Sequence, residues 1–261
     1  MSRKGFMPGC SLPSYSPFGV QKTLEYLKTV YPDISAIQKC CGKPTLLIGQ
    51  EEKFQERFND LKCDIKNCDV DEMIVACQNC HKMLKTTDDF KTKSLWVTLQ
   101  EIGIPKEEIG KGKGSDVVFA IHDSCSSREY PEIHNAIRYI LNELGYKTVE
   151  TSKSMSNTRC CGFGGMIAPV NYELAQKVME RRVQDFESRY VVTYCAACRQ
   201  AMIKGGAKSW HILDLIFGPV VYKNDDAPED VLSNTVKAWS NRYKSKKNII
   251  KTMNRGSYVR K

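Results

Sequence analysis

The apolar and polar positions along the chain predict one series of elements that occurs twice. Short apolar runs predict four buried strands, at residues 5–9, 73–76, 116–122 and 190–194. Apolar residues at helical spacing predict four amphipathic helices, over residues 18–30, 51–65, 131–144 and 171–186. Because strands alternate with helices, we expect an α/β fold with two duplicated domains and mostly parallel sheets.

A segment of low apolar content at residues 105–115 separates the two series. We therefore expect a first domain over residues 1–104 and a second over residues 116–218. Residues 219–261 are expected to form a C-terminal helical tail.

The twelve cysteines follow the same duplication. Each half contains a lone cysteine, an adjacent pair followed by glycine, and a Cys-x-x-Cys motif. The first set is Cys10, Cys40, Cys41, Cys77 and Cys80, and the second is Cys125, Cys160, Cys161, Cys195 and Cys198. Equivalent features lie 115, 120 and 118 residues apart, which indicates a duplication. Because predicted strands lead into the lone cysteines and the Cys-x-x-Cys motifs, we expect the sites in loops at strand carboxyl ends.

This cysteine content indicates metal or thiol redox chemistry. The N-terminus lacks the apolar segment of a secretory signal, and no run of 18 uncharged apolar residues could span a membrane. We therefore expect a cytoplasmic protein whose thiols stay reduced. One tetrahedral zinc ion needs at most four ligands, whereas five thiolates, two of them adjacent, suit an iron–sulfur cluster with several irons. Gly42 and Gly162, which follow the pairs, allow a close approach of the backbone.

The doubled pattern resembles the CCG, or cysteine-rich, domain pair found in the B subunit of heterodisulfide reductase and its relatives. These relatives include iron–sulfur subunits of lactate, glycolate and glycerol-3-phosphate oxidation systems. The resemblance covers roughly residues 3–217. It implies two noncubane [4Fe-4S] clusters, one for each set of five cysteines, with zinc as the alternative metal at the first site. It also implies an iron–sulfur oxidoreductase of the disulfide-reductase type that works as part of a complex.

The absence of other cofactor motifs points to partner subunits. The sequence contains no ferredoxin-type cysteine run, no dinucleotide-binding glycine motif and no P-loop. We therefore expect electrons to come from a ferredoxin-like subunit, a flavoprotein or both, and a disulfide or thiol to be the substrate. Two alternatives remain open. One is an electron-relay subunit of a flavin-dependent lactate- or glycolate-type oxidase complex, and the other is a zinc-binding structural module.

The second set is the expected place of catalysis, at Cys160, Cys161 and His122. His122 comes shortly before Cys125 and could give a proton to the thiolate that departs when a disulfide is reduced. The alternative is a structural histidine at a strand end, followed by residues that close a turn. A thioredoxin-like role for the Cys-x-x-Cys motifs is a further alternative, but the Cys-Cys-Gly partner in each half favours metal ligation.

Four other residues have two interpretations each. Cys63 and Cys68 lie outside the duplication and are either functional, as a redox pair or extra ligands, or incidental structural cysteines. In the structural interpretation, Cys63 faces away from the buried stripe of its helix and Cys68 packs as a small apolar residue. Arg128 and Arg159, near the second set, either attract an anionic substrate or partner or are ordinary surface arginines.

The net charge of +9 is confined to the C-terminal tail. From Lys237 onward the chain has nine Lys and Arg and no Asp or Glu, so the first 236 residues carry no net charge. This balance argues against nucleic-acid binding by the body.

Asp226 and Pro228 predict the start of a helix, and a loosely ordered extension is expected after Lys247. The predicted apolar face of that helix consists of Val231, Leu232, Val236 and Trp239. The tail is either a solvated terminus or a docking surface for an acidic partner or a membrane, which would place the protein at the membrane periphery.

Overall fold

The computed structural model describes residues 3–253 of the 261-residue chain. The described residues form two compact units. The first contains residues of the range 1–98 together with residues of the range 234–261, and the second contains residues 99–233. Both units are built of strands and helices in alternation, which confirms the predicted α/β fold class.

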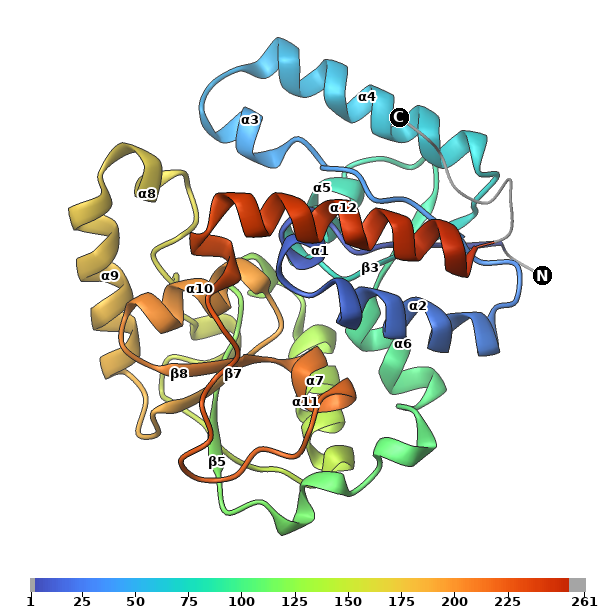
Figure 1. Ribbon diagram of the computed structural model, residues 1–261. Coiled ribbons are helices and arrows are strands. Elements are labelled where there is room, and N and C mark those ends of the chain that lie inside the picture. The colour runs from blue at the N-terminus through green and yellow to red at the C-terminus, as the bar shows by residue number, and fades with distance from the viewer. Residues whose placement is uncertain (1–2, 254–261) are drawn as a thin grey trace. The chain divides into compact units, whose positions relative to one another are not determined.

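The first unit contains a parallel four-stranded sheet in the order β2-β1-β3-β4, of which Figure 1 labels β3. Its strands are β1 (Lys4–Met7), β2 (Ser35–Ala36), β3 (Glu72–Val75) and β4 (Lys91–Ser94). Its helices are α1 (Ser11–Tyr15), α2 (Pro17–Val30), α3 (Lys43–Leu47), α4 (Glu51–Asn67), α5 (Gln78–Leu84) and α12 (Thr235–Thr252). Helix α6 (Leu95–Ile102) crosses the division between the units.

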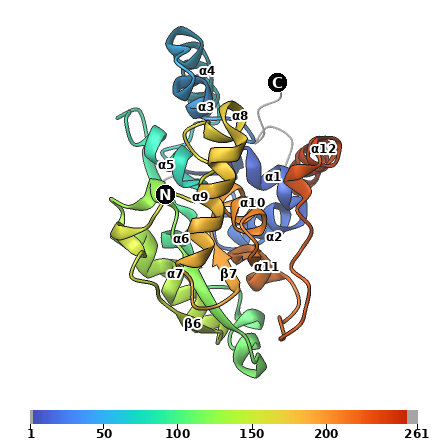
Figure 2. The same ribbon diagram turned by 90° about the vertical axis from the view of Figure 1, so that its left-hand side faces the viewer.

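The second unit repeats this sheet, with the parallel order β6-β5-β7-β8. Its strands are β5 (Val118–His122), β6 (Lys147–Val149), β7 (Tyr190–Thr193) and β8 (Lys208–His211). Its helices are α7 (Pro131–Leu144), α8 (Ile167–Val170), α9 (Tyr172–Gln184), α10 (Ala196–Lys204) and α11 (Ile212–Phe217). Figure 2 shows α9 and α10 packed side by side.

The central strands are apolar because they are buried on both faces. In β3, Met73, Ile74 and Val75 are 0–1% exposed, and Phe6 and Met7 of β1 are fully buried. Parallel strands covered by helices on both faces have this continuous apolar character rather than alternation. The four predicted strands are confirmed as β1, β3, β5 and β7.

Local capping chemistry fixes the start of two of the helices. The Ser16 hydroxyl accepts the N–H of Gly19 at 3.0 Å, and Pro17 begins α2 at a position where it loses no helical hydrogen bond. Asn171 caps α9 in the same way, by accepting the N–H of Leu174 at 3.0 Å. Four of the observed helices, α2, α4, α7 and α9, correspond to the four predicted ones.

Among the described residues, four strands have no counterpart in the four predicted apolar runs: β2, β4, β6 and β8. β4 and β8, each at the edge of its sheet, have the sequences KTKS and KSWH. Lysine at an edge strand suits a position with one unpaired side, but it leaves no apolar run in the sequence. The hydrophobic pattern therefore predicts only part of each sheet.

The C-terminal helix differs from its prediction. The chain at Pro228 is irregular, a 3-10 turn covers Val231–Ser233, and α12 begins after Asn234, whose side chain accepts the N–H of Lys237 at 3.0 Å. The predicted start is wrong because the Asn234 cap, rather than the Asp226–Pro228 signal, opens the helix. The helix also continues past Lys247 to Thr252, in place of the expected loose extension. The last eight residues lie outside the described part.

Within the described residues, the helices are too short or too polar to cross a lipid bilayer. The domain limits expected at residues 104, 116 and 218 stay a prediction.

Candidate functional site

The strand order of each sheet reverses direction at its two central strands. From β1 the chain moves outward to β2 on one side, and from β3 it moves outward to β4 on the other. Ligands of open α/β sheets bind at such a reversal, beyond the strand carboxyl ends. Cys10 and Cys77 follow β1 and β3, and Cys125 and Cys195 follow β5 and β7. The lone cysteine and the Cys-x-x-Cys motif of each half thus follow the carboxyl ends of the two central strands of their own sheet.

The five thiols of the first set form one connected group, which we call the first cysteine group. The thiol of Cys40 contacts those of Cys10 and Cys41. The thiol of Cys80 contacts those of Cys41 and Cys77. The thiols therefore follow one another in the order lone cysteine, adjacent pair, second and then first cysteine of Cys-x-x-Cys.

The second set forms an equivalent group with the same order of contacts, the second cysteine group. Here Cys160 contacts Cys125 and Cys161, while Cys198 contacts Cys161 and Cys195. Each thiol meets the same neighbours as its counterpart in the other half. The duplication seen in the sequence is thus a duplication of three-dimensional arrangement.

Close backbone approach shapes the first group. Gly9 has a positive φ of 83°, and a Cβ atom built on it would lie 2.8 Å from Cβ of Cys77. Gly42, with φ 78°, is the N-cap of α3 directly after the adjacent pair. Both positions require glycine, because a side chain would be strained at this φ and Gly9 also lacks room for one.

Contacts between the thiols lower the pKa of some of them and raise the pKa of others. The hydrogen bond from Cys125 is the main cause that lowers the pKa of Cys160 to about 2, and the hydrogen bond from Cys40 lowers the pKa of Cys41 to about 5. Neighbouring thiols and burial raise the pKa of Cys80 well above its ordinary value. One thiolate in a group thus disfavours the next, and a cationic partner would remove that penalty.

His122 lies at the second cysteine group and is fully buried. A ring nitrogen of His122 and the sulfurs of Cys161 and Cys198 all lie within 4.8 Å of one another. Its Nδ1 accepts the Nε–H of Arg182 at 3.0 Å, which leaves the ring proton of the neutral imidazole on Nε2. Burial and the charge of Arg182 lower the pKa of His122 to about 3. The imidazole is therefore neutral at physiological pH, and its role as proton donor stays a prediction.

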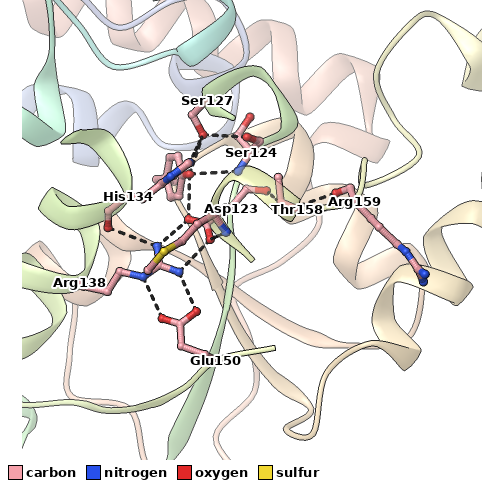
Figure 3. Close-up of polar contacts among 10 residues, drawn as sticks. Asp123, Ser124, Ser127, His134, Arg138, Glu150, Thr158 and Arg159 are labelled. Atoms are coloured by element: carbon pink, nitrogen blue, oxygen red, sulfur yellow. Dashed lines mark hydrogen bonds and ion pairs between the residues drawn. The ribbon is translucent and has the colours of Figure 1, made fainter. Parts of the chain in front are cut away.

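Asp123, the residue after this histidine, forms a buried ion pair with Arg138 (Figure 3). The Asp123 carboxylate is 0% exposed and accepts hydrogen bonds from both terminal nitrogens of Arg138, at 2.7 and 2.8 Å. It also accepts the N–H of Met155 at 2.7 Å and the hydroxyl of Tyr194 at 3.0 Å. Burial alone would raise the pKa of Asp123, but the hydrogen bonds and charge of Arg138 lower it. The carboxylate therefore stays charged inside the unit.

The network around Asp123 links the three segments that carry the second cysteine group (Figure 3). The Tyr194 hydroxyl accepts the N–H of Ser124 at 3.1 Å and contacts the hydroxyl of Ser127 at 2.8 Å. Thr158 donates its hydroxyl to the carbonyl of Asp123 at 2.8 Å. Ser124, Thr158 and Tyr194 each lie within two residues of a cysteine of the group. The network thus joins these three segments through hydrogen bonds of their own side chains and backbone.

The first unit has apolar residues at the equivalent positions. Relative to the cysteines, Pro8 stands where the second unit has Asp123, and Ala76 stands where it has Tyr194. Met7 takes the position of His122 and is fully buried. The two cysteine groups therefore share their thiol arrangement but differ in the polarity of what surrounds them.

The sequence does not indicate a site role for Arg138, Arg182 or Tyr194. Both arginines occupy amphipathic helices, where an arginine is normally assigned to the solvated face, and Tyr194 falls within a predicted strand. Arg182 is 1% exposed because His122 and Asp185 accept its hydrogen bonds. The partner at His122 comes from a distant segment, which a local pattern cannot show.

The remaining candidates have structural surroundings. Cys63 is exposed, and Cys68 packs partly against the core of the first unit, in line with their structural interpretation. Arg128 donates to the carbonyl of Thr158, at 2.8 Å from its Nε, and Arg159 pairs with Asp185 at 2.8 Å. Both guanidinium groups are thus engaged within the unit.

Three curated proteins are similar to this chain. The D subunit of dihydromethanophenazine:CoB–CoM heterodisulfide reductase from Methanosarcina barkeri is 23% identical over 203 residues, which cover 72% of this chain and 49% of the relative. Lactate utilization protein A of Macrococcus caseolyticus is 28% identical over 166 residues, covering 58% and 65%. EtfAB:quinone oxidoreductase of Syntrophomonas wolfei is 23% identical over 185 residues, covering 65% and 26%. The chain therefore spans less than two thirds of the length of each of these relatives.

A family model, that of the CCG cysteine-rich domain, matches this chain twice, at residues 5–85 and 119–203. Each match contains one complete cysteine group and the central strands that lead to it. The repeated cysteine motif and the two equivalent sheets agree with both matches. The chain therefore belongs to the CCG cysteine-rich domain family.

Proposed function

We propose that this chain is the iron–sulfur subunit of an oxidoreductase complex, similar to the B subunit of heterodisulfide reductase. In this proposal each cysteine group holds one noncubane [4Fe-4S] cluster, through the ten cysteines of the two groups. The observation that carries the proposal is the repeated order of five contacting thiols in the two units.

The donor set fits an iron–sulfur cluster better than a single zinc ion. Thiolates are soft ligands that both metals accept, but one zinc ion takes four at the corners of a small tetrahedron. Among residues 3–253, no four cysteine sulfurs lie within 4.8 Å of one another. The thiols instead follow one another as a chain of contacts, which suits ligands distributed over several irons.

Bound iron–sulfur clusters supply one-electron transfer. Reduction of a disulfide consumes two electrons and two protons and yields two thiols, so the electrons must arrive in separate steps from a reduced partner. We assign that partner to the ferredoxin-like or flavoprotein class, because the sequence contains no standard cofactor motif of either kind. The chain's own residues bury the thiols, and the Asp123 network positions the second cysteine group.

We place the disulfide chemistry at the second cysteine group, beside Cys160, Cys161 and His122. Two polar groups, Asp123 and Tyr194, lie beside this group, whereas Pro8 and Ala76 occupy the equivalent positions in the first unit. Development of negative charge on a departing sulfur costs less in polar surroundings. The second group is therefore the better place for thiolates to form.

An electron relay without disulfide chemistry is the second candidate function. It is favoured by two relatives, whose names refer to lactate utilization and to EtfAB:quinone oxidoreduction. The two functions differ in whether substrate meets the cluster. A thiol or disulfide that changes the EPR spectrum of the purified chain supports the reductase, whereas an unchanged spectrum supports the relay.

We expect the full-length chain, purified without oxygen, to be brown. It should absorb broadly near 400 nm and contain about eight irons and about eight inorganic sulfides per chain. Elemental analysis and sulfide determination on the same sample check this. A colourless protein with stoichiometric zinc would refute the iron–sulfur proposal and leave the zinc-binding module.

A further inference from the structure

Helix α12 presents an apolar and aromatic stripe on its outer side. Val236, Trp239, Tyr243 and Ile250 are 80%, 66%, 62% and 37% exposed. Their spacings of three, four and seven residues place them on one face of a helix that turns about 100° per residue. Large apolar side chains in such a row are unusual at a surface that meets only water.

The opposite side of α12 is fixed to the first unit, so the stripe is not a core face that failed to pack. α12 packs against α1 and α2, as Figures 1 and 2 both show. Asn241 donates to the carbonyl of Ser14 at 3.2 Å, and Arg242 donates to that of Cys10 at 3.0 Å. Ser245 and Ile249 are fully buried on this inner side. The orientation of the helix, and with it the exposure of the stripe, is therefore set by contacts.

Lys246 and Lys247 lie within about 60° of the stripe around the helix, and no acidic residue occurs in the helix. α12 contains five lysines, at positions 237, 244, 246, 247 and 251, and its single arginine is Arg242 on the inner side. The ammonium group of Lys247 lies 4.7 Å from the ring centroid of Tyr243. The outer side of the helix thus combines aromatic rings with positive charge alone.

We propose that this outer side of α12 binds the surface of an anionic lipid bilayer. Trp and Tyr rings favour the boundary between headgroups and acyl chains, and lysine stems reach from there to anionic headgroups. Interfaces between proteins are enriched in aromatic residues and arginine but depleted in lysine. The exposed Lys244, Lys247 and Lys251, with Arg242 turned inward, therefore fit a lipid surface better than a protein partner. The helix would lie in the plane of the interface without entering the bilayer core.

Trp239 provides a direct probe of this contact. The chain has three tryptophans, and the other two, Trp96 and Trp210, are 0% and 3% exposed. Only the emission of Trp239 should therefore respond to a surface contact. We expect vesicles of phosphatidylcholine with about 30% phosphatidylglycerol to shift this emission to shorter wavelength, and vesicles of phosphatidylcholine alone to bind far less.

Two sets of variants of the full-length chain test the assignment by vesicle co-sedimentation. Replacing Lys244, Lys247 and Lys251 by glutamine should weaken binding at low salt about 100-fold, at about fivefold per lysine. A control with the same change in net charge replaces the exposed Lys53, Lys106 and Lys223 and should bind within about twofold of the unaltered chain. Trp239→Ser should weaken binding and abolish the spectral shift.

Three results would overturn the proposal. The first is an unaltered chain that ignores anionic vesicles, and the second is equal weakening by the two lysine sets. The third is a Trp239→Ser variant that loses self-association in sedimentation experiments but keeps vesicle binding, which would make a second copy of the chain the occupant. Circular dichroism spectra of the variants should match, since every replaced side chain is exposed. The test does not depend on metal content and so stands apart from the proposed function.

Discussion

Replacing Cys41 by serine should halve the iron of the purified chain, from about eight to about four atoms, and Cys161→Ser should do the same. Each residue is the buried second member of an adjacent pair and contacts a thiol of Cys-x-x-Cys as well as its pair partner. Serine keeps nearly the same size, but its hydroxyl is a poor ligand for iron. Because the two groups belong to separate units, each loss should be independent and the double variant should hold almost no iron.

Cys63→Ser is the matched control for these variants. Cys63 is exposed and outside both groups, so its replacement should leave iron and sulfide unchanged. Iron determination together with absorption near 400 nm provides the readout. A Cys41→Ser chain that keeps all its iron, or one that also empties the second group, would contradict two independent five-cysteine sites.

Replacing Asp123 by asparagine should lower the free energy of unfolding by about 2–3 kcal/mol, the contribution of hydrogen bonds to a buried charged group. The change leaves the guanidinium of Arg138 without the carboxylate that takes two of its hydrogen bonds, in a place where Asp123 is 0% exposed. Glu150 still pairs with Arg138 from the exposed side, so the loss is that of the buried hydrogen bonds to Asp123. Urea unfolding followed by circular dichroism measures the difference.

Glu150→Gln gives the control, since Glu150 pairs with the same arginine. Its side chain is 43% exposed, and it accepts hydrogen bonds from Arg138 at 2.8 Å. An exposed partner of this kind contributes about 0–1 kcal/mol. Equal effects of the two replacements would show that burial of Asp123 is not what gives the ion pair its importance.

The sequence predicts the central strands and the thiols at their ends, but not the residues that surround the thiols. The apolar runs around Ile74 and Ala120 fit central strands, because strands covered on both faces have such composition. The repeated cysteine spacing then places the thiols at strand ends. The order in which the thiols contact one another cannot be predicted from the spacing, because it depends on how three separate segments fold at the ends of the central strands.

The sequence does not predict the burial of residues whose hydrogen-bond partners lie far away in the chain. The buried position of Arg182 depends on His122, sixty residues earlier in the chain, and local periodicity has no access to that pairing. The edge strand β4 contains two lysines, so an apolar run does not mark it in the sequence. Likewise Asn234, rather than the more conspicuous Pro228, caps α12.

The outward face of α12 illustrates the same limit. The sequence predicts Val236 and Trp239 on the apolar face of the helix, yet both are exposed. The buried face instead uses Ser245, Ile249 and the polar contacts of Asn241. Hydrogen bonds to backbone carbonyls of α1 thus help to decide which side of the helix packs.

A reductive titration of the anaerobically purified chain tests the central claim most directly. We expect each chain to take up about two electrons, one for each cluster, as the absorption near 400 nm bleaches. The difference in polarity between the two groups further predicts two separate reduction potentials, because hydrogen bonds and charge around a cluster set its potential. A chain that accepts no electrons, or a single one, would contradict two redox-active cysteine groups.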